Sequence, residues 1–113
     1  MAVKRYVYAL DLMDDEKIIA QYELHHKKEN IWPEIVEGIK QCQIERMDIY
    51  RIGNRLTMIL EADEKVDINE AFKKMADLPR QKEWAMLMNS FQQRIPFAKP
   101  DEHWALMNQI FEL

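Results

Sequence analysis

Tyr22 and His26, a tyrosine and a histidine four positions apart, are the pair whose residue types and spacing best fit chemistry. On a helix, side chains at this spacing lie on the same face, one turn apart. A histidine can take up and release a proton near neutral pH. A tyrosine beside it can hydrogen-bond a hydroxyl group or stack on a sugar. We interpret the pair as an acid–base group next to a substrate contact; the alternative is a helix surface with a solvated histidine.

The histidines do not predict a metal site. His25 and His26 are adjacent, so on a helix their side chains point about 100° apart and chelate one ion poorly, even with Glu29 nearby. The sequence has neither a Gly-rich phosphate loop nor a nucleophile elbow. The residues themselves therefore indicate neither a metal site nor a phosphate-binding loop.

Three tryptophans are the other candidates for contact with a ligand. Trp32, Trp84 and Trp104 are large rings in a short chain, and an aromatic face can pack against the C–H surface of a sugar. Packing in the hydrophobic core is the alternative for each of them.

The composition indicates one folded domain that spans residues 1–113, with 48% apolar and 10% aromatic residues. The formal net charge of −4 and the scattered basic residues argue against nucleic acid or a membrane surface as a partner. The single cysteine, Cys42, can form no disulfide within the chain, which suits a reducing compartment. Because no apolar run is long enough for a membrane span, we expect a cytoplasmic protein.

The elements that would position Tyr22 and His26 begin with a strand. Residues 3–12 alternate and are rich in Val and Tyr, which is typical of a strand. Asp14 is a suitable N-cap for a helix from Asp15 to about Lys28 that carries both candidate residues. Pro33 then suits the first turn of a second helix.

The second half of the chain repeats this alternation of strands and helices. Residues 44–52 and 56–60 indicate two strands, joined by the hairpin signal Gly53-Asn54. Asp67 opens a capping-box pattern for a short helix. That helix ends before Pro79, which can start another helix. This last helix would bury an apolar stripe of Trp84, Leu87, Met88 and Phe91.

Residues 104–113 form an apolar, strand-like tail that completes the order β-α-β-β-α-β. This order predicts an α+β, ferredoxin-like fold with the helices on one face of the sheet. We expect the other face to carry residues such as Tyr6, Tyr8 or Met58. Such an apolar face needs a cover, so we expect a homodimer formed through the open sheet faces.

Several motifs, spread over nearly the whole chain, resemble those of the L-rhamnose mutarotase family. Tyr22 to His26 matches its Y-x-x-x-H motif, and Ile31 to Glu34 matches its [IV]-W-P-E motif. Residues 49–56 resemble its central hairpin, 81–84 its Q-x-W-W-like helix start, and 107–113 its closing strand.

The resemblance implies a dimeric α/β barrel without a cofactor that interconverts the anomers of a monosaccharide. His26 would be the acid that protonates the ring oxygen, with His25 as a weaker rival. Tyr22 and Trp84 would contact the sugar, with Trp32 as a further candidate contact.

Three departures from the family pattern bear on the substrate. Five residues separate His26 from Trp32, where the family's shorter form has three. Glu83 replaces a second tryptophan beside Trp84, and Met47 replaces a tyrosine of the pocket. These departures point to the branch of the family that acts on L-fucose, so we expect a 6-deoxy-hexose, either L-fucose or L-rhamnose.

Two other functions stay open. Ferredoxin-like dimeric barrels also include monooxygenases and heme-binding proteins, for which His26 or His103 would be the axial ligand. A binding module that holds a small ligand without catalysis is the third interpretation.

Overall fold

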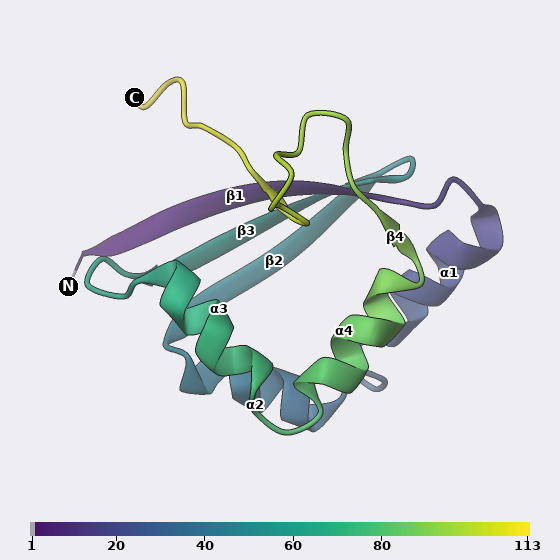
Figure 1. The fold of residues 1–113 in the computed structure, drawn as a ribbon, viewed down its shortest axis with the longest axis horizontal. Coiled ribbons are helices and arrows are strands. Elements are labelled where there is room, and N and C mark those ends of the chain that lie inside the picture. The colour runs from purple at the N-terminus through teal and green to yellow at the C-terminus, as the bar shows by residue number, and fades with distance from the viewer. Residues whose placement is uncertain (1) are drawn as a thin grey trace.

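The computed structural model describes residues 2–113 as one antiparallel sheet with its helices on one side (Figure 1). The expected order of elements is confirmed, since each predicted helical region forms two helices and strands occupy both ends. The elements are β1 (Val3–Leu12), α1 (Glu16–His25), α2 (Pro33–Gln41), β2 (Ile44–Ile52), β3 (Arg55–Asp63), α3 (Ile68–Ala76), α4 (Gln81–Asn89), β4 (Gln92–Gln93) and β5 (Ala105–Leu106).

The sheet has the strand order β2-β3-β1-β4, and β5 also pairs with β1. This is the ferredoxin-like arrangement, in which the first and third strands lie side by side at the centre. The hairpin between β2 and β3 turns at Gly53-Asn54 as expected, and Gly53 has a φ of 56°, a value that favours glycine. Asn54 also ties the hairpin to β1, because its side chain donates to the carbonyl oxygen of Leu12 at 2.9 Å.

The expectation about which face of the sheet is open was wrong. Tyr8 and Met58 pair across β1 and β3 and lie in a core cluster with Ile68 of α3, on the side that the helices cover. Tyr6 packs against the same cluster. Alternation shows which residues share a face, but the choice of the covered face depends on the fully buried leucines of the same register, such as Leu10 and Leu60.

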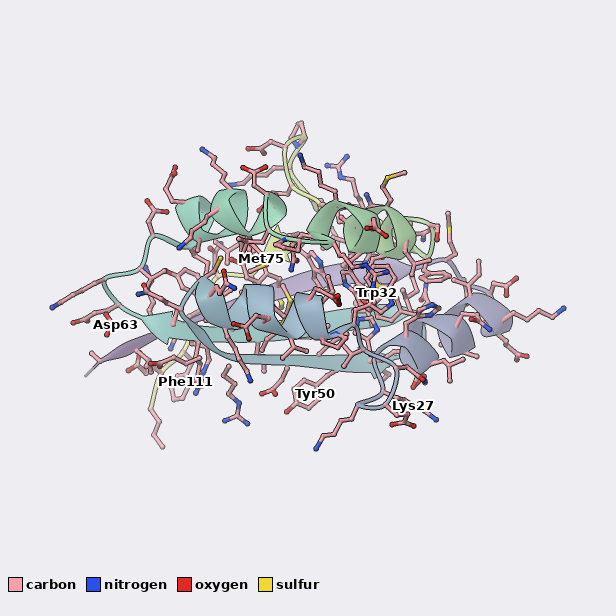
Figure 2. The ribbon with its side chains drawn as sticks, turned by 90° about the horizontal axis from the view of Figure 1, so that it is seen from below. Lys27, Trp32, Tyr50, Asp63, Met75 and Phe111 are labelled. Carbon is pink, nitrogen blue, oxygen red and sulfur yellow. The ribbon has the colours of Figure 1, made fainter. Side chains whose placement is uncertain are left out.

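The outer face of the sheet is instead formed by the alternate residues. Val7 pairs with Ile59, Ala9 pairs with Thr57, and Thr57 in turn pairs with Tyr50 of β2. Figure 2 shows Tyr50 and Phe111 on the side of the sheet away from α3 and α4. Tyr50 is 58% exposed, so an apolar surface does face outward here, although it is not the one expected.

Helix α1 begins and ends differently from the prediction. Its N-cap is Asp15, whose carboxylate accepts from the backbone N–H groups of Lys17 and Ile18, and not Asp14. The helix ends at His25, with His26 as the C-cap, because Asn30 folds back to donate to the carbonyl oxygen of Leu24 at 2.9 Å.

None of the described helices is long and apolar enough to cross a lipid bilayer.

Of the other three predicted helix starts, two are confirmed and one is wrong. Pro33 stands in the first turn of α2, and Asp67 caps α3 through the N–H groups of Asn69 and Glu70. Pro79 does not start α4, which begins at Gln81 after Arg80 in a left-handed conformation with a φ of 62°. Arg80 thus lies in the short connection between α3 and α4.

The C-terminal tail is a strand only at Ala105–Leu106, and not throughout residues 104–113. The N–H of Met107 still donates to the carbonyl oxygen of Val7 at 2.8 Å, after which the tail leaves β1. Strand propensity alone cannot hold such a segment, because a strand needs a partner for its backbone groups. Ile110, Phe111 and Leu113 are exposed as a result.

Candidate active site

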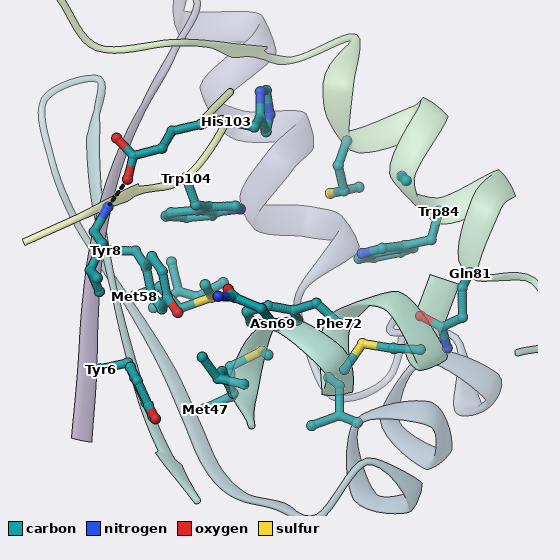
Figure 3. Close-up of a pocket in the computed structure, with 18 of the residues that line it drawn as sticks. Tyr6, Tyr8, Met47, Met58, Asn69, Phe72, Gln81, Trp84, His103 and Trp104 are labelled. Carbon is teal, nitrogen blue, oxygen red and sulfur yellow. Dashed lines mark hydrogen bonds between the residues drawn. The ribbon is translucent and has the colours of Figure 1, made fainter. Parts of the chain in front are cut away.

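A cavity of about 1210 Å³ lies between the sheet and the helices, with walls from every layer of the fold. Figure 3 shows Trp84 and Gln81 on one side of it, Tyr6 and Tyr8 on the other, and Trp104 between them. A mostly apolar cavity with a few polar groups is typical of a small-molecule site.

Tyr22 and His26 lie together at the C-terminal end of α1, and both line this cavity. Their ring centroids are 4.3 Å apart, and the ring planes are inclined by 32°. Tyr22 is only 3% exposed, while His26 is partly exposed. The structure thus brings together the two side chains that the sequence paired.

The backbone of α1 determines which nitrogen of His26 carries a proton. Nδ1 lies 2.7 Å from the carbonyl oxygen of Tyr22. Because a carbonyl oxygen can only accept, Nδ1 is the protonated nitrogen, and the neutral ring has its lone pair on Nε2. Burial lowers the pKa of His26 below its usual 6.5. The hydrogen bond to the backbone of Tyr22 raises this pKa in part, and the nearby His25 lowers it again. His26 is therefore a neutral imidazole with a basic Nε2 at pH 7.

The phenol of Tyr22 is held in its protonated form. Burial raises the pKa of Tyr22 to about 12, although a hydrogen bond from Gln92 acts in the opposite direction. In that bond, Nε2 of Gln92 donates to the phenol oxygen at 3.4 Å. The hydroxyl proton of Tyr22 stays available for a bound molecule.

Trp84 supplies an aromatic wall, and Trp32 supports it from behind. Trp84 of α4 lines the cavity with its ring centroid 5.4 Å from that of His26. Trp32 packs edge-on against it at 5.1 Å between ring centroids, and the guanidinium of Arg80 lies 3.8 Å from the centroid of Trp32. The left-handed Arg80 therefore has a second role, in holding this aromatic stack in place.

Met47 and Glu83 are the two residues that differ from those expected at their positions in the L-rhamnose mutarotase family. The structure places them in different environments. Met47 of β2 lines the cavity. Glu83 is exposed on α4 and lies 3.6 Å from Arg80, outside the residues that line the cavity.

The end of the chain adds polar groups to the site that the sequence did not indicate as substrate contacts. Gln92 of β4 and His103 both line the cavity, as does Trp104, which the sequence had already indicated as a candidate ligand contact. Nε2 of His103 lies 2.8 Å from Oε1 of Gln92, the same side chain that contacts Tyr22. A glutamine in a two-residue strand has no pattern that would identify it, whereas His103 was considered only as a heme ligand.

Among residues 2–113, no group of three or more His, Cys, Asp or Glu side chains is placed to hold a metal ion.

Comparison with known proteins identifies relatives over the whole chain. The family model described as L-rhamnose mutarotase (rhaM) matches residues 5–113. An L-fucose mutarotase of Xanthomonas campestris pv. campestris is 38% identical over 113 residues, which cover 100% of this chain and 90% of the relative. A UPF0734 protein of Dictyostelium discoideum is 36% identical over 114 residues, covering 97% of this chain and 90% of the relative.

Solved structures share the fold. An L-rhamnose mutarotase from Formosa agariphila superposes with a TM-score of 0.67 at 18% identity, over 97% of this chain and 98% of the other. The tetracenomycin F2 cyclase of Streptomyces glaucescens, a type-II polyketide cyclase, gives 0.64 at 12% identity, over 97% and 96% of the two chains. At such low identity these likenesses concern the architecture alone.

Proposed function

The chain belongs to the L-rhamnose mutarotase family, and from this membership we propose that it interconverts the α and β anomers of a 6-deoxy-hexose at the cavity of Tyr22 and His26. It is a carbohydrate isomerase, as the mutarotases of this family are. The observation that carries the assignment of the site is the contact of a neutral imidazole with a protonated phenol at the wall of one cavity.

We propose L-fucose as the first substrate to test and L-rhamnose as the second. The relative that is 38% identical is named for L-fucose, whereas the L-rhamnose enzyme of known structure is 18% identical. Met47 supports the same order, because it lines the cavity at the position where the resemblance to the L-rhamnose pattern would put a tyrosine. No observation on the described residues favours a heme protein, a monooxygenase or a non-catalytic binding module over a mutarotase.

Mutarotation requires that the sugar ring opens and closes again. In the opening step, the anomeric hydroxyl loses its proton, the bond from C1 to the ring oxygen breaks, and the ring oxygen gains a proton. Neutral His26 is suited to take the first proton at Nε2, because its Nδ1 is already protonated. We assign the second transfer to the Tyr22 hydroxyl, which burial keeps protonated until the ring oxygen becomes basic.

Ring closure reverses both transfers after rotation about the C1–C2 bond. The imidazolium of His26 then returns a proton from Nε2 to the aldehyde oxygen, and the phenolate of Tyr22 takes the proton back from the attacking hydroxyl. His26 is thus the base in ring opening and the acid in ring closure, both at the anomeric oxygen. This differs from the role expected from the sequence, in which His26 protonates the ring oxygen, because that proton now comes from Tyr22. Trp84 offers its ring to the C–H face of the sugar, and Trp32 holds Trp84 in position.

Saturation-transfer NMR across a small panel of sugars tests this function. The protein should accelerate anomer exchange of L-fucose more than that of L-rhamnose, and ordinary hexoses should respond least. A purified, folded chain that accelerates none of them would remove the proposed function.

We also propose that the working form is a homodimer joined through the outer face of the sheet. Tyr50 and Ile52 are exposed there, and the apolar tail residues Ile110 and Phe111 add to the exposed apolar surface. An extended apolar surface of this kind marks an interface, and a self-complementary patch gives a two-fold dimer.

The cytoplasm is the compartment we propose. Cys42, the only cysteine in the sequence, is a free thiol that is buried at the C-terminal end of α2. Free thiols of this kind are typical of proteins in a reducing compartment.

A further inference from the structure

The C-terminal part of the chain connects a partly exposed histidine to the phenol of Tyr22 through one buried amide. His103 precedes β5, Gln92 belongs to β4, and Tyr22 belongs to α1, so three distant segments meet here. Gln92 is only 8% exposed, and both ends of its amide are used.

The direction of this chain of hydrogen bonds follows from the chemistry of the amide. Oε1 of Gln92 can only accept, so Nε2 of His103, 2.8 Å away, carries a proton. Nε2 of Gln92 can only donate, so the phenol oxygen of Tyr22 accepts at 3.4 Å. Because the oxygen of Tyr22 accepts from inside the protein, its own proton is free to point at a molecule in the cavity.

The opposite arrangement would remove the donor that the reaction needs. If the amide of Gln92 were turned over, Oε1 would face Tyr22 and would accept the hydroxyl proton. Tyr22 would then present only its lone pairs to the sugar and could not give a proton to the ring oxygen.

We propose that Gln92 and His103 are positioning residues that keep the hydroxyl of Tyr22 pointing at the sugar as a proton donor. This inference rests on the proposed function and names the groups that complete its acid side. Here the relay means the three residues His103, Gln92 and Tyr22.

The surroundings of His103 favour the neutral imidazole, which is the form that the relay requires. Partial burial lowers the pKa of His103, and the nearby charge of Arg94 lowers it further. Arg94 is itself held by the loop, since its Nε donates to the carbonyl oxygen of Glu102 at 2.7 Å. A neutral His103 has one ring proton, and the contact with Gln92 places it on Nε2.

Two substitutions at His103 separate the relay from a structural role. In His103→Gln a side-chain amide can still donate to Oε1 of Gln92, so the relay keeps its direction. In His103→Glu the new carboxylate can only accept, so Nε2 of Gln92 turns to donate to it. Oε1 of Gln92 then faces Tyr22 and accepts the hydroxyl proton. Both changes lie at a partly exposed loop position, so both variants should fold.

The experiment measures anomer exchange of L-fucose by saturation-transfer NMR at saturating and at low sugar, with thermal unfolding as a check of folding. We expect His103→Gln to stay within about twofold of the wild type. We expect His103→Glu to lower the rate at saturating sugar by about 10²–10⁴-fold, because Tyr22 then no longer acts as a general acid, with little change in KM. Gln92→Glu also makes the hydroxyl of Tyr22 donate inward, whereas Gln92→Met leaves that hydroxyl free to turn. The exchange rate of Gln92→Glu should therefore be lower than that of Gln92→Met.

A direct measurement on the wild type uses no activity. The ¹⁵N shifts of His103 should show a proton on Nε2, and a proton on Nδ1 alone would overturn the relay. Equal exchange rates in His103→Gln and His103→Glu would also overturn it while leaving the proposed function in place. A wild type that exchanges no sugar removes the proposed function, and the catalytic role of the relay with it.

Discussion

The imidazole of His26 lies on the phenol ring of Tyr22, while its Nδ1 donates to the backbone carbonyl oxygen of the same tyrosine. One residue therefore fixes both the position and the tautomer of the other. This arrangement leaves Nε2 as the only basic atom of the ring, which is the basis for the predictions that follow on catalysis.

His26→Ala should lower the enzyme-catalysed exchange by about 10²–10⁴-fold, because it removes a general acid–base group. His25→Ala is the matched control. His25 makes the same bond one residue earlier, from Nδ1 to the carbonyl oxygen of Gln21 at 2.7 Å, but it is not among the residues that line the cavity. Saturation-transfer NMR on both variants checks this; a larger loss in His25→Ala would give the role to the rival histidine.

The exchange rate should be constant through pH 7 and fall only in more acidic solution. Burial lowers the pKa of His26, and the base form is the neutral one, so activity is lost as the pH falls through that lowered pKa. The midpoint of kcat/KM against pH should therefore lie below 6.5, the usual value for the group. Tyr22, with a pKa of about 12, adds no loss in mildly alkaline solution. A midpoint above 7 would contradict the neutral-base assignment.

Met47→Tyr should shift the preference between sugars, and Glu83→Ala should not. Met47 lines the cavity, whereas Glu83 is exposed and paired with Arg80. The measurement is the ratio of kcat/KM for L-fucose to that for L-rhamnose. Discrimination by a single side-chain contact is worth roughly 10–200-fold at most, so a change of a few-fold toward L-rhamnose is expected for Met47→Tyr. An equal shift in both variants would mean that position 83 also reaches the sugar.

Gly38→Ala should destabilise the fold, although alanine favours a helix by about 1 kcal/mol over glycine. A Cβ at this position would clash with Nε2 of Gln81, the buried side chain that donates to the carbonyl oxygen of Glu34 at 3.0 Å. Relieving the clash breaks that bond and separates α2 from α4, at a cost of about 1–3 kcal/mol. Urea unfolding measures the loss, with the exposed Glu37→Ala on the same helix expected to change stability by less than about 0.5 kcal/mol. A stabilised Gly38→Ala would show that Gln81 moves aside freely.

Tyr50→Asp should convert the proposed dimer to a monomer. Tyr50 lies on the outer face of the sheet, where a buried carboxylate without a partner would oppose association. Light scattering coupled to gel filtration gives the mass. Met86→Asp on the opposite, helical side is the control, since Met86 is exposed on α4. If the wild type is already a monomer, the dimer proposal is wrong.

The local pattern of the chain was enough to predict most of the architecture. Strand alternation in residues 3–12, the helix starts at Pro33 and Asp67, and the Gly53-Asn54 turn are each determined within a few residues, and each was found in the structure. The order of elements then gives the ferredoxin-like fold, because few arrangements connect them. The pairing of Tyr22 with His26 also followed from spacing alone.

Errors of one to three residues arose where neighbouring groups competed for the same role. Asp14 and Asp15 are both good caps, and only the observed backbone decides between them. The end of α1 depended on Asn30, whose side chain reaches back to Leu24. Such choices differ by small free energies that the pattern does not reveal.

By itself, the sequence determined which residues share a face or a turn, because those relations depend on backbone periods of two and of 3.6 residues. Only the tertiary structure decided that Tyr8 and Met58 face the helices, that Glu83 points outward, and that Gln92 joins His103 to Tyr22. These relations depend on segments far apart in the chain packing across one cavity, and no local period carries that information.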